Sequence, residues 1–197
     1  MISAREFGIE LATHMDKNNP NDFVVCKSVK TYGSLAEMVF RAGDGDYLEI
    51  GTWKGASAII AASTKIEYRL SGMIYCVDHF CGYHNEYIGT QEAMDNFKKY
   101  NVLDRINIIV APARPLPFMK QIRFESAFID GDHWEDNPYL DFKEIEGQVN
   151  KYILIDDYNH DARHTVMENV DRILKDFPIW GISDVMEGHH ILLERIA

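Results

Sequence analysis

The stretch YLEIGTWKGASAIIAA, residues 47–62, passes from strand-like to helix-like residues across a turn that contains two glycines. Gly51 and Gly55 lie in that turn, where glycine tolerates a positive φ and lets the backbone approach a ligand closely. The stretch lacks the full glycine set of a dinucleotide site and the Lys-Ser/Thr ending of a phosphate loop. It therefore predicts either a ligand-binding turn between a strand and a helix, or a turn that needs glycines for structural reasons alone.

Four more β-rich runs follow, and helix-length segments separate them. Because the runs are nearly continuous in apolar residues, they are typical of parallel strands covered on both faces. The alternation of strands and helices predicts an α/β fold. The predicted strands are 46–50, 73–78, 106–110, 126–130 and 152–156, and the predicted helices are 55–67, 88–100, 138–148 and 163–176.

After the last of these helices, two β-like runs follow in quick succession, at 180–185 and 189–196. Turn-forming residues join them, so they indicate an antiparallel hairpin that closes one edge of the sheet. The predicted fold is a Rossmann-like, doubly wound, seven-stranded sheet, mostly parallel apart from the hairpin, with helices on both faces. His189 and His190 would start an edge strand, and no His-Glu-x-x-His motif indicates zinc.

Two further helices, at about 2–15 and 31–42, are expected before the first strand. We interpret residues 1–197 as one domain, with amino-terminal helices in 1–43 and the sheet-containing core in 44–197. A homodimer is one expected assembly, since two-fold contacts are the commonest closed symmetry. The apolar positions of the first helix that would join the hairpin in such a contact are Ile2, Phe7, Ile9 and Leu11.

The composition of the chain limits which partners and which cellular location are expected. With a formal net charge of −11 and 20 scattered Lys and Arg residues, the chain is a poor partner for nucleic acid. It has no run of eighteen apolar residues and no basic-then-apolar start, and its 3 cysteines lack zinc-type spacing. These features predict a soluble, cytoplasmic protein with reduced thiols and no membrane partner.

The second predicted strand ends in Asp78, roughly twenty to thirty positions after the glycine turn. Sheets of this type place a carboxylate there, on the two ribose hydroxyls of a bound nucleoside. The position of Asp78 therefore favours the ligand-binding interpretation of the glycine turn.

Together, the EIGTWKGAS turn, the position of Asp78 and the terminal hairpin resemble the class I S-adenosylmethionine-dependent methyltransferases, over about residues 44–196. The resemblance implies S-adenosylmethionine as cofactor. The loop that borders the adenine in that family departs from its pattern, because Ala111, Pro112 and Ala113 stand where relatives often carry Gly, Asp and Ser. The cofactor-binding residues that the resemblance implies are Glu49, Gly51, Thr52, Gly55, Ser57, Asp78, His79 and Asp130.

Acidic residues end two other predicted strands. FIDGDHWED, residues 128–136, contains Asp130, and the strand at 152–156 ends in Asp156 with Asp157 beyond it. Ends of neighbouring parallel strands lie about 4.8 Å apart, so these carboxylates should converge and repel one another. A hard divalent cation such as Mg²⁺ would remove that conflict. The alternative is that the aspartates cap the following helices.

This acidic pattern narrows the resemblance to the cation-dependent O-methyltransferases: the macrocin or antibiotic-sugar group and the catechol and caffeoyl-CoA enzymes. It implies Asp130, Asp156 and Asp157 as metal ligands, with Mg²⁺ as the ion and Mn²⁺ or Ca²⁺ as alternatives. By the same resemblance, the catalytic base is His133, where catechol-type enzymes carry a lysine, or Asp132, where the sugar enzymes carry an aspartate. The alternative for His133 is a polar loop residue without a catalytic role.

Two other features have more ordinary interpretations. DNPY, residues 136–139, is similar to a motif of methyltransferases that act on nucleic acid bases, but its single Pro138 fits the first turn of a helix better. Trp53, Trp134 and Tyr158 are candidates to line the acceptor pocket, or packing residues near strand ends.

The sequence therefore predicts metal-dependent O-methylation of a small hydroxylated acceptor, such as a sugar or a catechol. Two alternatives stay open: a methyltransferase acting on protein or nucleic acid, and a nucleoside-binding relative that does not methylate.

Overall fold

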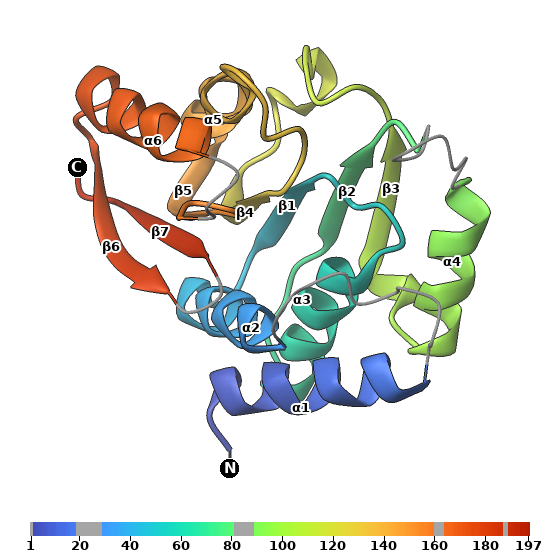
Figure 1. The fold of residues 1–197 in the computed structure, drawn as a ribbon. Coiled ribbons are helices and arrows are strands. Elements are labelled where there is room, and N and C mark those ends of the chain that lie inside the picture. The colour runs from blue at the N-terminus through green and yellow to red at the C-terminus, as the bar shows by residue number, and fades with distance from the viewer. Residues whose placement is uncertain (1, 19–28, 81–88, 160–163, 187–188) are drawn as a thin grey trace.

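The computed structural model describes residues 2–18, 29–80, 89–159, 164–186 and 189–197. Its centre is a seven-stranded sheet of order β3-β2-β1-β4-β5-β7-β6. The strands β1 to β5 run parallel, and β7 is antiparallel to both of its neighbours. Figure 1 shows the sheet with the hairpin at one side. The strands are β1 Asp46–Ile50, β2 Ile74–Asp78, β3 Ile106–Val110, β4 Phe124–Ile129, β5 Val149–Ile155, β6 Trp180–Met186 and β7 His190–Arg195.

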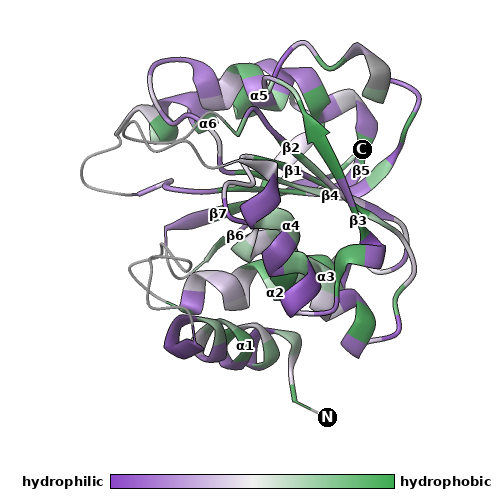
Figure 2. Cartoon of the chain, turned by 90° about the vertical axis from the view of Figure 1, so that its right-hand side faces the viewer, coloured by the Kyte–Doolittle hydropathy of each residue, from purple (hydrophilic) through white to green (hydrophobic). Residues whose placement is uncertain are grey.

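Helices cover both faces of the sheet, with α1 to α4 on one side and α5 and α6 on the other (Figure 2). Each face has its own cluster of buried apolar side chains. The predicted doubly wound, Rossmann-like fold is confirmed. The helices are α1 Ala4–Asn18, α2 Lys30–Ala42, α3 Ala56–Glu67, α4 Thr90–Lys99, α5 Asn137–Ile145 and α6 His164–Asp176, and three short 3-10 turns are Leu103–Arg105, Pro117–Met119 and Glu146–Gln148.

Strand β1 lies in the middle of the sheet, between β2 and β4. Its residues 47–50 are all buried, which explains why the run is apolar apart from Glu49 and shows no alternation. The chain moves outward from β1 to β2 and β3, and then returns to place β4 on the other side of β1. Sheets of this type bind ligands at the carboxyl ends of the strands, at the point where the strand order reverses. Here that point lies between β1 and β4.

The prediction that His189 and His190 start an edge strand is wrong. Strand β7 is not an edge strand, because it pairs with β5 on one side and β6 on the other. The edge strand is β6. The continuous apolar run Ile191–Leu193 is fully buried, whereas in β6 only the two end residues, Trp180 and Met186, are buried. Apolar continuity therefore marks the interior strand of the hairpin.

Several boundaries differ from the expected ones by a few residues. Helix α4 begins at Thr90, and residue 88, where it was expected to begin, lies outside the described residues. Helix α5 begins at Asn137 with Pro138 in its first turn, which confirms the helix-start interpretation of DNPY. It ends at Ile145, and β5 already begins at Val149.

Helix α1 packs lengthwise against α2 beneath the sheet (Figure 1). The residues it buries are Ala4, Gly8, Ala12 and Met15, while Ile2 is exposed. The predicted dimer contact through this region stays a prediction. None of the helices in the described ranges has the length and apolar character that crossing a bilayer requires.

Candidate active site

The two glycines after β1 are explained by close packing within the chain. Both have φ +89, a left-handed conformation that favours glycine. A Cβ at Gly51 would overlap the backbone carbonyl of Asp130, and a Cβ at Gly55 would overlap the ring of Phe97 on α4. Close packing within the chain is therefore sufficient to explain why both positions are glycine. The packing at Gly51 also brings the ends of β1 and β4 together.

The Asp78 carboxylate holds the same turn from the end of β2. One oxygen accepts hydrogen bonds from the backbone N–H groups of Thr52, at 2.8 Å, and Trp53, at 2.7 Å. The other accepts one from the N–H of Phe80 at 2.6 Å. His79 is mostly exposed, and its Nδ1 lies 3.7 Å from Asp78 Oδ1. Asp78 thus shapes the turn in addition to any contact with a ligand.

Two buried oxygens near the end of β1, Glu49 Oε1 and Thr52 Oγ1, make no hydrogen bond of normal geometry among the described residues, although the hydroxyls of Ser57 and Thr52 lie near enough to the Glu49 carboxyl to lower its pKa. Glu49 is completely buried, and its other oxygen accepts a hydrogen bond from the Tyr47 hydroxyl at 3.1 Å. Burial raises the pKa of the Glu49 carboxyl to about 7. A buried polar atom without a partner is costly, so these two oxygens indicate a ligand that supplies hydrogen-bond donors.

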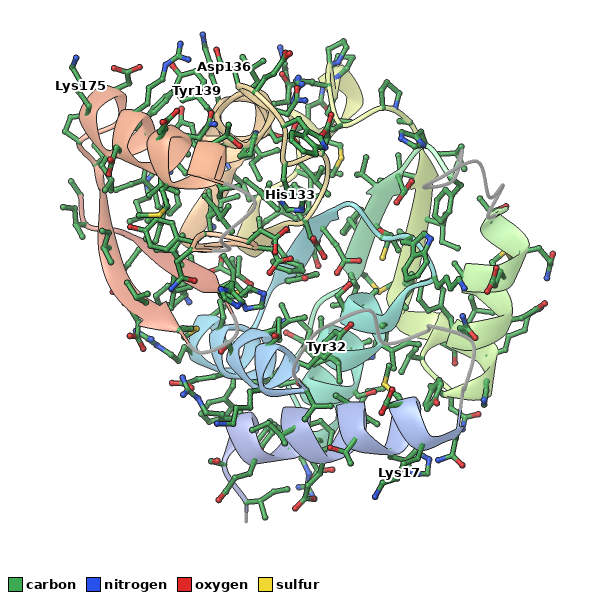
Figure 3. All side chains as sticks on the ribbon, viewed as in Figure 1. Lys17, Tyr32, His133, Asp136, Tyr139 and Lys175 are labelled. Atoms are coloured by element: carbon green, nitrogen blue, oxygen red, sulfur yellow. The ribbon has the colours of Figure 1, made fainter. Side chains whose placement is uncertain are left out.

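Asp130 and Asp156 directly follow β4 and β5, and His133 lies beside them. One ligand atom from each of these three residues lies within 4.8 Å of the other two. The Nε2 atom of His133 is 3.3 Å from Asp130 Oδ1 and 3.9 Å from Asp157 Oδ2. Figure 3 shows His133 in the middle of the molecule, near the loop that follows β1. The carboxylates of Asp130 and Asp156 therefore lie close together, whereas Asp157, the third expected ligand, is not part of this group, in which His133 is the third member.

The alternative that these aspartates cap helices receives no support. The residue at the N-cap position of α5 is Asp136, not Asp130. Helix α6 begins only at His164, well after Asp156 and Asp157.

The carboxylates of Asp130 and Asp156 repel one another, and this repulsion affects their pKa values. Burial, together with the neighbouring Asp156 carboxylate, raises the pKa of Asp130 well above its usual range. Burial alone would also raise the pKa of Asp156, but the contact with His190 outweighs it and holds that pKa at about 2. Ionisation of Asp156 therefore disfavours ionisation of Asp130, and a bound cation would reduce the repulsion between the two carboxylates.

His190 is a candidate functional residue that the sequence interpretation missed. It is only 1% exposed, and its Nε2 lies 2.8 Å from Asp156 Oδ1. Its position follows from the pairing of β5 with β7, which sets Ile155 opposite Ile191 and so brings Asp156 beside His190.

Between these residues and α2 lies a small cavity of about 20 Å³. That volume has room for one water molecule or one ion. Its polar lining comes from Thr31, Tyr32, Ser57, Asp130, Asp156 and His190.

A family model described as a methyltransferase domain matches residues 48–158, more than half of the chain. The chain belongs to this methyltransferase family. The predicted enzyme class, a methyltransferase, is confirmed by this match. No curated protein matches the sequence at a significant level.

Solved structures share the fold of this methyltransferase. The O-methyltransferase NovP has 18% identity and a TM-score of 0.71, over 86% of this chain and 81% of that chain. An O-methyltransferase from Bacillus cereus, in complex with S-adenosylhomocysteine, has 16% identity and a TM-score of 0.64, over 95% and 90%. The S-adenosylhomocysteine-bound methyltransferase PaMTH1 from Podospora anserina has 19% identity and a TM-score of 0.61, over 99% and 88%. At these identities the likeness shows the fold alone.

The second candidate base of the methyltransferase, Asp132, is exposed and bonded within its own loop. Its Oδ1 accepts a hydrogen bond from the Trp134 N–H at 3.1 Å, and its Oδ2 accepts one from Asn137 Nδ2 at 2.7 Å. His133, in contrast, is only 8% exposed, and its Nε2 lies near the carboxylates of Asp130 and Asp157. The geometry favours His133 over Asp132 as the base.

The three aromatic candidates do not line the small cavity of the methyltransferase. Trp134 is exposed, and the Trp53 ring lies 4.7 Å from the ammonium of Lys54. Tyr158 packs against the apolar cluster on the α5 and α6 side.

Proposed function

We propose that this methyltransferase transfers a methyl group from S-adenosylmethionine to a hydroxyl oxygen of a small acceptor held on a divalent cation. The observation that carries the proposal is the cluster of Asp130, Asp156 and His133 at the reversal point of the sheet. Cofactor and acceptor would then meet over the carboxyl ends of β1 and β4.

S-adenosylmethionine can supply hydrogen-bond donors to two buried oxygens at the end of β1. Glu49 Oε1 and Thr52 Oγ1 are buried oxygens that make no hydrogen bond of normal geometry among the described residues, and an amino acid ammonium group supplies donors for both. S-adenosylmethionine carries such a group beside the sulfonium that supplies the methyl. Asp78, one strand away, accepts three backbone N–H groups and keeps about one of its roughly four lone-pair sites for a ribose hydroxyl. The bound S-adenosylhomocysteine in two solved structures of this fold supports the same cofactor.

The cation fits the donor set at the ends of β4 and β5. Asp130 and Asp156 supply carboxylate oxygens, which Mg²⁺ and Mn²⁺ both accept. Asp157 is the third proposed ligand, since its Oδ2 lies on the His133 side of the cluster. A divalent cation there would offset the mutual repulsion of the carboxylates and stabilise a developing alkoxide.

His133 is the proposed base. The acceptor hydroxyl must lose its proton to become a good nucleophile, and an imidazole nitrogen accepts a proton near neutral pH. The carboxylates of Asp130 and Asp157 lie 3.3 and 3.9 Å from Nε2. These distances place the ring beside the proposed cation site, within reach of a hydroxyl held there.

The acidic character of this edge favours a small neutral acceptor with vicinal hydroxyls, as in a sugar or a catechol. Phosphate-bearing polymers are disfavoured by the local carboxylates and by the net charge of −11. Calorimetric titration with S-adenosylhomocysteine, with and without Mg²⁺, tests the proposal. Absence of any binding would favour the non-methylating nucleoside-binding alternative, and a preference for polymeric acceptors would favour a protein or nucleic acid substrate.

Replacing Asp78 with alanine should lower the affinity for S-adenosylhomocysteine at least about tenfold, the effect of losing one charge-assisted hydrogen bond. The variant loses the acceptor for three backbone N–H groups of the turn as well as the proposed ribose contact. Isothermal calorimetry measures the change. Asp44→Ala is a matched control, because Asp44 also accepts a backbone N–H, from Ser71 at 2.7 Å, at the opposite edge of the sheet. An unchanged affinity in Asp78→Ala would contradict the proposed cofactor position.

A further inference from the structure

One face of α6 is hydrogen-bonded to the loop that joins β4 to α5 and carries His133. Thr165, Asn169 and Arg172 follow one another at spacings of four and three residues, which places them in a row along the helix. Each contacts a different loop residue, at positions 133, 135 and 136. Figure 3 shows Asp136 and Tyr139 in the region where α5 and α6 lie. The helix therefore holds the loop at several successive points.

Asn169 makes the most complete set of these contacts. It is 4% exposed, and its Nδ2 donates hydrogen bonds to the carbonyls of Glu135 and Thr165, both at 2.7 Å. Its Oδ1 accepts a hydrogen bond from the N–H of Tyr139 at 3.2 Å. One buried amide thus joins the loop, the first turn of α5 and α6.

The loop needs such a restraint because Glu135 has φ +53, a left-handed conformation that is unfavourable for a residue with a side chain. A residue held in this conformation returns to ordinary backbone angles unless its surroundings prevent it. The hydrogen bond from Asn169 to the Glu135 carbonyl is in the right place to prevent it.

Thr165 holds the loop on the other side of Trp134. Its hydroxyl donates a hydrogen bond to the backbone carbonyl of His133 at 2.9 Å. The peptide groups of His133 and Glu135 are therefore both tied to α6. With its backbone restrained in this way, the His133 ring has a defined place beside Asp130.

We propose that Asn169 and Thr165 are positioning residues for His133, which act by holding the backbone of its loop against α6. This inference rests on the proposed role of His133 as the base. Neither residue touches the reacting atoms in this account, and a base must be held in reach of the proton it accepts. Loss of either contact should free the His133 ring from its buried position.

The test is the rate at which diethyl pyrocarbonate modifies His133, measured by peptide mass spectrometry on the full chain. Thr165→Val should raise this rate roughly tenfold, the factor that one lost hydrogen bond of ordinary strength produces, and Asn169→Ala, which removes three hydrogen bonds, should raise it at least as much. Thr165→Ser keeps the hydroxyl and should keep the native rate. Asn150→Ala is the matched control, because it removes an exposed amide that bonds Glu125 far from the loop.

Buried His190 serves as an internal reference, since global loosening would raise its modification rate as well. If Asn169→Ala loosens the whole fold in this way, the comparison of Thr165→Val with Thr165→Ser decides. Equal His133 rates in Thr165→Val, Thr165→Ser and the native protein would overturn the proposal. The assay uses no cofactor, metal or acceptor. A failure of the proposed function would instead appear as absent binding of S-adenosylhomocysteine or Mn²⁺, while the modification rates still decide the role of α6.

Discussion

Replacing Asp156 with asparagine should abolish methyl transfer while the affinity for S-adenosylhomocysteine stays within about threefold of the native value. Asparagine keeps the size of the side chain and removes the charge that a cation needs. Loss of an outer partner of a metal ligand alone costs about 10- to 100-fold in metal affinity, so loss of a ligand should cost about 100-fold or more. Calorimetric titrations with Mn²⁺ and with S-adenosylhomocysteine measure the two effects separately, and Asp130→Asn should behave in the same way.

The matched control is Asp136→Asn, which removes an exposed carboxylate from the same loop at the start of α5. Its affinity for Mn²⁺ should equal that of the native protein. EDTA should abolish methyl transfer by the native enzyme, and added Mg²⁺ or Mn²⁺ should restore this activity. Native-like activity of Asp156→Asn in the presence of EDTA would show that the carboxylates have a structural role only.

Loss of the His133 imidazole should slow the chemical step by about a hundredfold or more, the usual contribution of a general base. In His133→Ala the affinities for Mn²⁺ and S-adenosylhomocysteine should stay within about threefold of native values, because the proposed ligands are carboxylates. Single-turnover transfer of a labelled methyl group to small vicinal diols and catechols measures the rate.

Asp132→Asn is the comparison variant for this experiment. Because both Asp132 oxygens are bonded within the loop, this variant should keep most of the rate. A larger loss in Asp132→Asn than in His133→Ala would assign the base to Asp132. A fall in Mn²⁺ affinity that matches the fall in rate for His133→Ala would make His133 a metal ligand.

Much of the fold could be predicted because its signals are local. Buried parallel strands are nearly continuous in apolar residues, and β1 illustrates this, since residues 47–50 are all buried and Glu49 is the one charged residue among them. The acidic residues at the ends of β4 and β5 could be expected to meet because neighbouring parallel strands end at one edge. Asp78 could be placed at the end of β2 because it is the last residue of the apolar run that predicted this strand.

The features that could not be predicted depend on packing between distant segments. The requirement for Gly55 comes from the ring of Phe97, on a helix about forty residues later in the chain. The contact of His190 with Asp156 depends on the order of β6 and β7, which the two strands do not reveal by length or turn residues. The apolar run Ile191–Leu193 was the available signal that β7 is the interior strand.

The hydrogen bonds of Asp132 illustrate a different limit. The pattern Asp-Gly-Asp-His contains two candidate bases, and only the loop conformation decides which of them faces the cluster. In the structure Asp132 is bonded to Trp134 and Asn137, while His133 is buried beside Asp130. Side-chain direction within a short loop is set by such contacts, which the sequence alone does not give.

In the proposed mechanism, a divalent cation sits between the carboxylates at the ends of β4 and β5, beside the cofactor. Anomalous diffraction from crystals grown with Mn²⁺ and S-adenosylhomocysteine would locate this ion. We expect a strong anomalous peak about 2.0–2.6 Å from carboxylate oxygens of Asp130 and Asp156, the range of hard-cation contacts, with the nucleoside ribose near Asp78. A structure with S-adenosylhomocysteine bound and no anomalous peak between these carboxylates would contradict it.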